Sequence, residues 1–154
     1  MITEDYVSFE TAKLLKEKGF KEWCRQCYGL DVRHNGEPID VDEEYELKNT
    51  GRDNEIEYVD GGRMYDYGCG NFNPGSPYAA PSLYVAMKWL REVHKIHIQI
   101  WILEDNGYWF DIEKILNAQY KHKSLYSTGL EDIYFNSYEE ACEAGIKYCL
   151  ENLI

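Results

Sequence analysis

Residues 81–115 decide the fold, and they read PSLYVAMKWLREVHKIHIQIWILEDNGYWFDIEKI. In the first part of this stretch, apolar side chains recur at the three- and four-residue spacing of a helix, with charged side chains on the opposite side. In the second part, isoleucine occupies every other position from Ile96 to Ile102, which is the two-residue period of a strand. The stretch therefore predicts a helix that begins after Ser82, then a strand, and then an antiparallel partner strand from Tyr108 to Ile115.

The turn of this hairpin can be placed by matching apolar residues across it. A two-residue Asn106-Gly107 turn would set Ile102 opposite Asp111, whereas a three-residue loop that ends with Gly107 pairs Ile102 with Phe110. Glycine at the third loop position also suits the left-handed residue of a G1 bulge. We therefore expect the loop 105–107. This register gathers on the face away from the isoleucines the side chains of His97, Gln99, Trp101, Leu103, Trp109, Asp111 and Glu113.

Two further helices are predicted at the ends of the chain. Ser8 is placed as the N-cap of a helix that ends before Gly19, since glycine commonly follows a helix C-terminus. Ser137 and Glu140 form a capping box that opens a final helix to about Leu153. The buried stripe of this final helix is expected to consist of Cys142, Ile146, Cys149 and Leu153.

A second hairpin is predicted nearer the N-terminus. The Asn35-Gly36 pair is typical of a two-residue type I′ turn, here between apolar strands at about 30–34 and 37–41. Pro38 cannot donate a hydrogen bond to a neighbouring strand, which favours an edge position for the second strand. The whole chain is thus expected to be an α+β protein in αββ-αββ-α order. Its two β-hairpins would form an antiparallel sheet with three helices packed on it.

The chain is expected to be a single domain, residues 1–154, that carries residues 48–80 as a long loop insertion rich in glycine and tyrosine. Aromatic residues on a glycine- and asparagine-rich backbone are typical of paratopes, and an arginine could meet an anion. One hypothesis is therefore a ligand-binding loop, and the alternative is a structural cover over the core. The candidate ligand-binding residues are Arg63, Tyr65, Tyr67, Asn71, Phe72, Asn73 and Tyr78.

The hairpin at residues 96–115 offers another candidate site on its face away from the isoleucines. Two tryptophans on an exposed sheet face are typical of a protein–protein hot spot. The candidate partner-binding residues are Trp101, Trp109, Gln99 and Asp111. Burial of this face under the long loop or the last helix is the alternative.

The formal charge of −12 is concentrated in two segments. Residues 40–60 hold nine acidic and two basic residues, and residues 131–151 hold six acidic residues and one basic residue. Extended nucleic-acid binding is not expected, because it needs clustered cations. The first segment instead offers an acidic patch that could mimic nucleic acid, made of Asp42, Glu43, Glu44 and Glu46.

Catalytic and metal-binding motifs give little support for an enzyme. Cys24 and Cys27 form a CxxC pair, but zinc would need two more ligands, for which His94 and His97 are the available candidates. Ordinary structural thiols are the favoured interpretation, ahead of a zinc site or a redox pair. No nucleophile motif, phosphate-binding loop or metalloprotease motif occurs, so no catalytic residue, metal or cofactor is expected.

Location and assembly follow from the same sequence features. No apolar run is long enough for a membrane span, and the acidic N-terminal segment lacks the basic flank of a signal peptide. Five cysteines, an odd and low number, favour reduced thiols in a cytoplasm. An exposed tryptophan face or an edge strand would favour a homodimer.

Three segments together carry a resemblance: VSFETAKLLKEKGF near the N-terminus, YAAPSLYVAMKWLREVHKIHIQI at residues 78–100, and NSYEEACEAGIKYCLENLI at the C-terminus. They resemble a group of small uncharacterised proteins encoded by Bacteroidales phages and mobile elements. Residues 36–75 depart from that group. The resemblance implies a phage or mobile-element origin and a bacterial cytoplasmic setting, and it transfers no activity to any residue.

The sequence therefore favours a non-catalytic binding protein over an enzyme. Antagonism of host defence is the expected role, either by sequestering a small, anionic, nucleotide-like ligand or by occluding a host protein. The acidic nucleic-acid mimic is the first alternative, and an uncharacterised enzyme is the second.

Overall fold

The computed structural model describes residues 2–28, 57–59, 62–71, 78–116 and 121–154. Its backbone contacts divide the chain into two compact units. The N-terminal unit is Ser8–Pro81, and the C-terminal unit comprises Val7 and the residues before it together with Ser82–Ile154. The described residues contain three α-helices and two antiparallel sheets, which confirms the α+β class. The strands lie in these two sheets, not in the one sheet that was expected.

The N-terminal unit combines helix α1 (Phe9–Glu17) with a sheet of order β2-β3-β1-β4. The Ser8 hydroxyl oxygen accepts a hydrogen bond from the Thr11 amide at 3.2 Å, which confirms the predicted N-cap. Gly19 follows the helix with a φ of +89°. The apolar face of α1 and the sheet form a core that contains Phe9, Ala12, Leu15, Phe20, Cys27, Tyr28 and Ala79.

Strands replace part of the predicted loop insertion at residues 48–80. β1 (Cys24–Tyr28) pairs with β3 (Gly62–Cys69), and β3 also pairs with β2 (Glu57–Val59). The short β4 (Tyr78–Ala79) pairs with the other edge of β1. The expectation of an irregular segment from residue 57 onward is therefore wrong. Pairing with a distant strand orders these residues, and their glycine-rich sequence lacks the alternation that would reveal a strand.

Two further predictions concern segments outside the described residues. The hairpin around Asn35-Gly36, with Pro38 on its second strand, lies there entirely. The parts of the loop insertion at 48–56, 60–61 and 72–77 lie there as well. The single-domain organisation stays a prediction.

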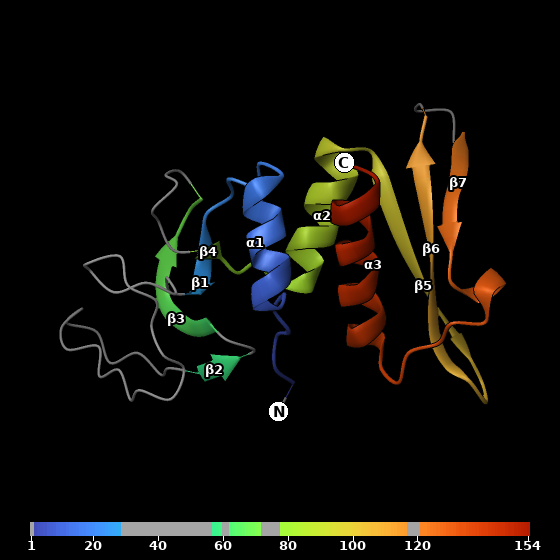
Figure 1. Ribbon diagram of the computed structural model, residues 1–154, viewed down its shortest axis with the longest axis horizontal. Coiled ribbons are helices and arrows are strands. Elements are labelled where there is room, and N and C mark those ends of the chain that lie inside the picture. The colour runs from blue at the N-terminus through green and yellow to red at the C-terminus, as the bar shows by residue number, and fades with distance from the viewer. Residues whose placement is uncertain (1, 29–56, 60–61, 72–77, 117–120) are drawn as a thin grey trace. The chain divides into compact units, whose positions relative to one another are not determined.

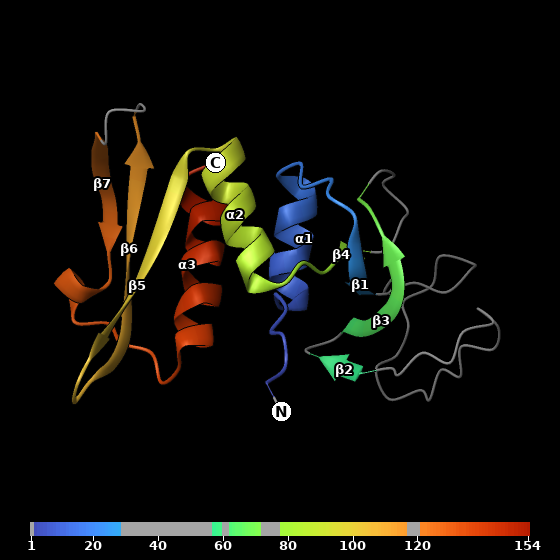
Figure 2. The same cartoon turned by 180° about the vertical axis from the view of Figure 1, so that it is seen from behind.

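The C-terminal unit is a three-stranded antiparallel sheet, ordered β5-β6-β7, with two helices on one of its faces (Figures 1 and 2). The helices are α2 (Leu83–Val93) and α3 (Tyr138–Asn152), and the strands are β5 (Ile96–Leu103), β6 (Gly107–Ile115) and β7 (His122–Ser127). The core between the two layers contains Ala86, Leu90, Ile96, Ile98, Phe110, Ile112, Ala141, Ile146, Cys149 and Leu150. No helix among the described residues is long and apolar enough to cross a membrane.

The predicted helix caps of this unit are confirmed. The Ser82 hydroxyl oxygen accepts from the Val85 amide at 3.5 Å at the start of α2. At the start of α3, the Ser137 hydroxyl oxygen accepts from the Glu140 amide at 3.1 Å, and the Glu140 carboxylate accepts from the Asn136 amide at 3.0 Å. Caps of this kind satisfy amides that the first helical turn leaves without partners.

The β5–β6 hairpin has the predicted faces but a different register. Ile102 lies opposite Tyr108, not Phe110, and Leu103 lies opposite Gly107. The loop is three residues long as expected, but it spans 104–106 instead of 105–107. Gly107 adopts a φ of +94° within the strand, and a Cβ there would overlap the Phe135 carbonyl oxygen. This contact between distant parts of the chain sets the register, and no local pattern shows it.

β7 was not predicted. β7 runs from His122 to Ser127 and pairs with β6, so a third strand extends the predicted hairpin. Phe135 forms only an isolated bridge to Tyr108. The register of β7 shifts between Ile112 and Glu113, and this bulge interrupts the alternation that a strand prediction needs.

Candidate functional site

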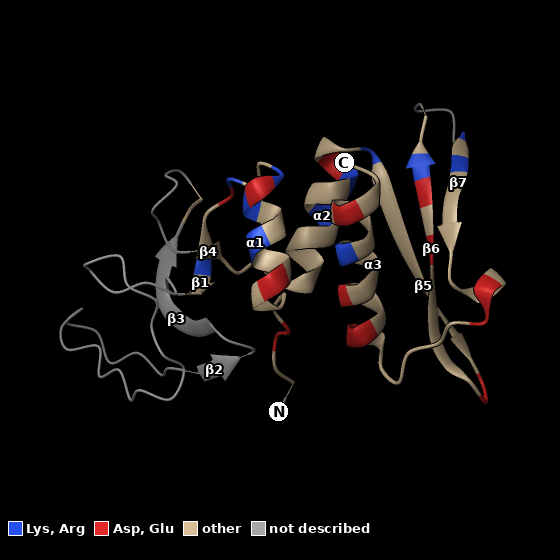
Figure 3. Ribbon diagram, viewed as in Figure 1, with Lys and Arg blue, Asp and Glu red and all other residues tan. Residues whose placement is uncertain are grey.

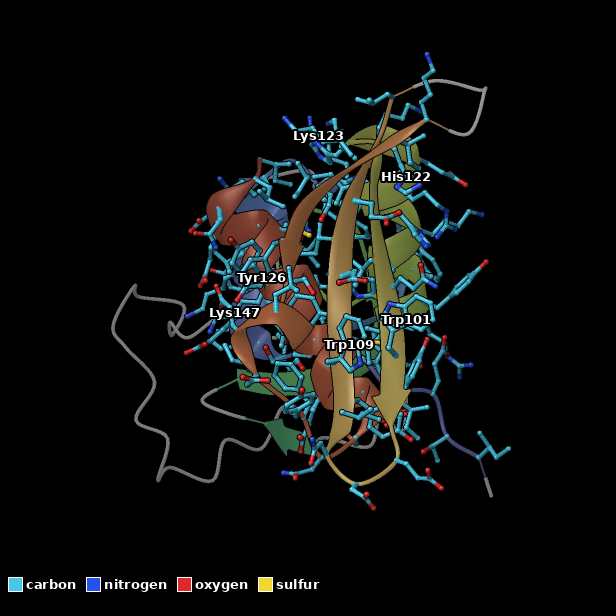
Figure 4. The ribbon with its side chains drawn as sticks, turned by 90° about the vertical axis from the view of Figure 1, so that its right-hand side faces the viewer. Trp101, Trp109, His122, Lys123, Tyr126 and Lys147 are labelled. Carbon is cyan, nitrogen blue, oxygen red and sulfur yellow. The ribbon has the colours of Figure 1, made fainter. Side chains whose placement is uncertain are left out.

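The best candidate site is the face of the β5–β6–β7 sheet opposite α2 and α3, which Figure 4 shows toward the viewer. Ile98, Phe110 and Ile112 point to the helices and are buried. Because side chains alternate along a strand, the residues between them face the other way. We call this outer surface the Trp face, and define it as Gln99, Trp101, Trp109, Asp111, Glu113 and His122. The four residues predicted to bind a partner are thus brought together.

Trp101 and Trp109 form a stacked pair at the centre of the Trp face. They lie directly opposite each other on β5 and β6, with ring centroids 5.9 Å apart and ring planes inclined by 20°. The Trp101 indole Nε1–H donates to a carboxylate oxygen of Asp111 at 3.0 Å. Trp101 remains 42% exposed despite both contacts. The neighbours therefore hold a large apolar surface in one orientation while leaving it open to solvent.

Trp109 is half-buried because the turn after β7 lies against its ring. That turn is the short 3-10 helix η1 (Gly129–Glu131). A Cβ on Gly129 would come within 2.6 Å of the Trp109 ring atom Cε3. Only glycine permits so close an approach between this backbone and the indole. Sequence reasoning missed this support, since a single glycine in an irregular segment gives no signal of what it will contact.

Polar groups border the tryptophan pair. Towards one end of the sheet, His122 Nδ1 lies 3.1 Å from a Glu113 carboxylate oxygen, and both side chains reach solvent. An aromatic centre with a polar border is the usual composition of a protein-binding surface. The His122–Glu113 pair was not predicted, because it depends on the unexpected strand β7.

The candidate ligand-binding residues of the N-terminal unit are only partly described. Asn71 is buried: its Nδ2 donates to the Phe20 carbonyl at 3.0 Å, and its Oδ1 accepts from the Ala79 amide at 2.9 Å. Tyr78 meets the Phe9 ring edge-on with centroids 5.5 Å apart, and the Lys16 ammonium lies 4.9 Å from its centroid. Both side chains therefore make contacts within the N-terminal unit.

The remaining candidates are placed by backbone alone or lie outside the described residues. Arg63, Tyr65 and Tyr67 belong to β3, where Arg63 pairs with Tyr58 and Tyr65 pairs with Cys27. Outside the described residues lie Phe72, Asn73 and the acidic patch Asp42, Glu43, Glu44 and Glu46. Among described residues, acidic side chains recur along α3, including Glu139 and Glu140 in its first turn, where the helix dipole favours them (Figure 3).

The cysteines described by the structure are buried. Burial raises the pKa of Cys142 to about 11 and that of Cys149 to about 12, so both are neutral thiols at physiological pH. Cys24 and Cys27 are also buried, and both lie on β1. Within the described ranges, no group of three or more His, Cys, Asp or Glu side chains could hold a metal ion.

Comparison of the chain with protein-family models, curated proteins and solved structures finds no match.

Proposed function

We propose that this chain is a non-catalytic binding protein that occludes another protein with its Trp face. The stacked Trp101–Trp109 pair carries the proposal. It offers a large, pre-ordered apolar surface whose exposure costs free energy in water, and burial against a partner would recover that cost.

Two observations support a protein partner over a small ligand. The Trp face is an outward sheet surface bordered by Gln99, Asp111 and the Glu113–His122 pair, as a protein interface would be. In addition, Asn71 and Tyr78, two of the residues expected to hold a small ligand, use their side chains in packing. Neutral, buried Cys142 and Cys149 are poor nucleophiles, which supports a role without covalent catalysis.

The biological setting is part of the proposal and rests on the resemblance to phage and mobile-element proteins. The partner would then be a host protein of a Bacteroidales cell, bound in its cytoplasm. Inhibition of a host-defence protein is the role that fits such an origin.

The proposal is tested with the full chain as an affinity bait in Bacteroidales lysate, followed by binding measurements with the purified partner. We expect a one-to-one complex whose Kd rises roughly 30-fold or more in Trp101→Ala, since hot-spot tryptophans contribute about 2 kcal/mol or more. Chemical-shift changes in the bound state should centre on the Trp101 and Trp109 indoles.

Trp23→Ala is the matched control, because Trp23 is 67% exposed and lies in the N-terminal unit. It should leave the Kd unchanged. If Trp101→Ala binds the purified partner as well as the wild-type chain does, or if the shifts centre elsewhere, the Trp face is not the binding surface.

A further inference from the structure

We infer that the Trp face selects a segment of its protein partner that presents an arginine side chain between apolar residues. The guanidinium group would stack on the exposed indole of Trp101 and pair with the carboxylate of Asp111. The inference rests on the proposed function, because it names the chemistry that the Trp face recognises in its partner.

The charged side chains of the β5–β6–β7 sheet are divided between its two faces. Lys114 lies on the helix side, where its ammonium group donates to the His94 carbonyl at 2.6 Å. Lys123 lies directly opposite Lys114, so it shares that side of the sheet. Asp111 and Glu113 alternate with the helix-side residues of β6 and point the other way. Among the described strands of this sheet, the outer face therefore carries carboxylates but neither lysine nor arginine.

The chain around the tryptophans is acidic as well. Residues 96–113 contain four acidic residues and residues 124–146 contain five, and neither segment contains a lysine or an arginine. Figure 3 shows the resulting separation, with acidic residues at the β5–β6 loop and η1 and basic residues at the far ends of β6 and β7. The tryptophan end of the sheet is therefore negative and attracts a cationic partner segment.

The contact between Trp101 and Asp111 places a carboxylate at the edge of an exposed aromatic ring. The indole Nε1–H donates to a carboxylate oxygen at 3.0 Å. An ionised carboxylate has about four acceptor positions, of which this hydrogen bond uses one. A cation on the exposed surface of the indole is therefore attracted both by the ring and by the carboxylate beside it.

Arginine fits this arrangement better than lysine does. The guanidinium group is planar, so it can stack on an indole while its N–H groups donate to a carboxylate at the ring edge. It is also more weakly hydrated than an ammonium group, which makes it less costly to bring against an apolar ring. Tryptophan is the aromatic side chain that attracts cations most strongly.

Exposed apolar side chains lie on either side of the tryptophan pair. Leu103 follows Trp101 on the same face of β5 and is 42% exposed. Leu130 is 88% exposed on η1, next to Gly129, which lies against the Trp109 ring. A partner segment that spans this surface would therefore carry apolar residues before and after its arginine.

The test titrates the isotope-labelled full chain with a capped pentapeptide that has arginine between two leucines and a serine at each end. Nuclear magnetic resonance follows the indole N–H signals, and those of Trp101 and Trp109 should shift until they saturate. Three matched peptides replace the arginine with lysine, with citrulline, which has a similar planar shape without the charge, or with glutamate. We expect the lysine peptide to bind roughly threefold more weakly and the citrulline peptide roughly fivefold more weakly or worse. The glutamate peptide should cause no saturable shift.

Asp111→Asn tests the carboxylate without removing the ring. The asparagine side-chain oxygen can still accept from the Trp101 indole, so the ring keeps its place while the charge is lost. This variant should bind the arginine peptide roughly threefold more weakly or worse, and the preference for arginine over citrulline should shrink by a similar factor. Glu151→Gln is the matched control, because it removes one negative charge from the exposed end of α3 and should leave the Kd unchanged. Circular dichroism verifies that both variants fold.

The results separate this inference from the proposed function. The inference is overturned if the arginine peptide causes no saturable shift of the two indoles, if the citrulline peptide binds equally well, or if Asp111→Asn changes nothing. A purified host partner whose binding falls in Trp101→Ala would then still support the proposed function. Selective binding of the arginine peptide, with no protein captured from lysate, would uphold arginine recognition and count against the occlusion of a host protein.

Discussion

Replacing Gly107 with alanine tests whether the contact with Phe135 fixes the β5–β6 hairpin. Two costs add at this position. A left-handed φ of +94° costs a residue with a Cβ about 1–2 kcal/mol. The Cβ would also overlap the Phe135 carbonyl oxygen, which accepts from the Tyr108 amide at 2.9 Å. Relieving such an overlap by moving backbone costs about 1–3 kcal/mol.

The expected loss in the free energy of unfolding for Gly107→Ala is therefore about 2–5 kcal/mol, less a few tenths because alanine restricts the unfolded chain. Urea unfolding followed by tryptophan fluorescence measures it, since Trp89, Trp101 and Trp109 all belong to the C-terminal unit. The amide of Tyr108 should also lose protection from hydrogen exchange.

Gly19→Ala separates the two costs. Gly19 has a similar φ of +89°, but a Cβ there would have no atom within 4 Å. This variant should lose about 1 kcal/mol from backbone strain alone, measured by circular dichroism for the N-terminal unit. Equal losses in the two variants would mean that the Phe135 backbone yields freely, and the account of the register given above would be refuted.

Two further predictions concern buried polar groups. Asn71→Ala should destabilise the N-terminal unit by about 2–4 kcal/mol, because it removes the hydrogen bonds of the Asn71 side chain to the Phe20 carbonyl and the Ala79 amide. Equal urea midpoints for wild type and variant would contradict this prediction. His94 has a lowered pKa, caused first by burial and then by Lys114, so the folded state favours the neutral ring. The contribution of His94 to the stability of the folded state is therefore complete above the unfolded pKa of 6.5 and falls as the pH drops below it. Urea midpoints measured at pH 7.5 and at pH 5.5 should differ less in His94→Gln than in wild type.

The periodic parts of the sequence predicted the C-terminal unit well. The helical spacing before His94 and the alternating isoleucines after it specify α2, β5 and the two faces of the hairpin, because burial on one side imposes these periods. The exact register was missed by two residues, since it depends on Phe135, which is distant in the sequence.

Alternation alone predicted that the two tryptophans share a face. It did not predict the contacts that surround them. Alternation places Trp101 and Trp109 on one side of the hairpin, whatever lies beneath the other side. The contact of Gly129 with Trp109 and the Glu113–His122 pair depend on β7 and the turn after it. β7 contains a bulge, and strands β2 to β4 are short or rich in glycine, so their order comes from pairing partners far along the chain.

The pairing of β1 with β3 has a consequence for the length of the chain that joins them. The pairing brings β1, which ends at Tyr28, beside β3, which begins at Gly62. The entropy of closing a flexible loop grows only with the logarithm of its length, so doubling the loop costs about 0.6 kcal/mol. Lengthening or shortening the chain between β1 and β2 would therefore change the entropy of forming this sheet only slightly.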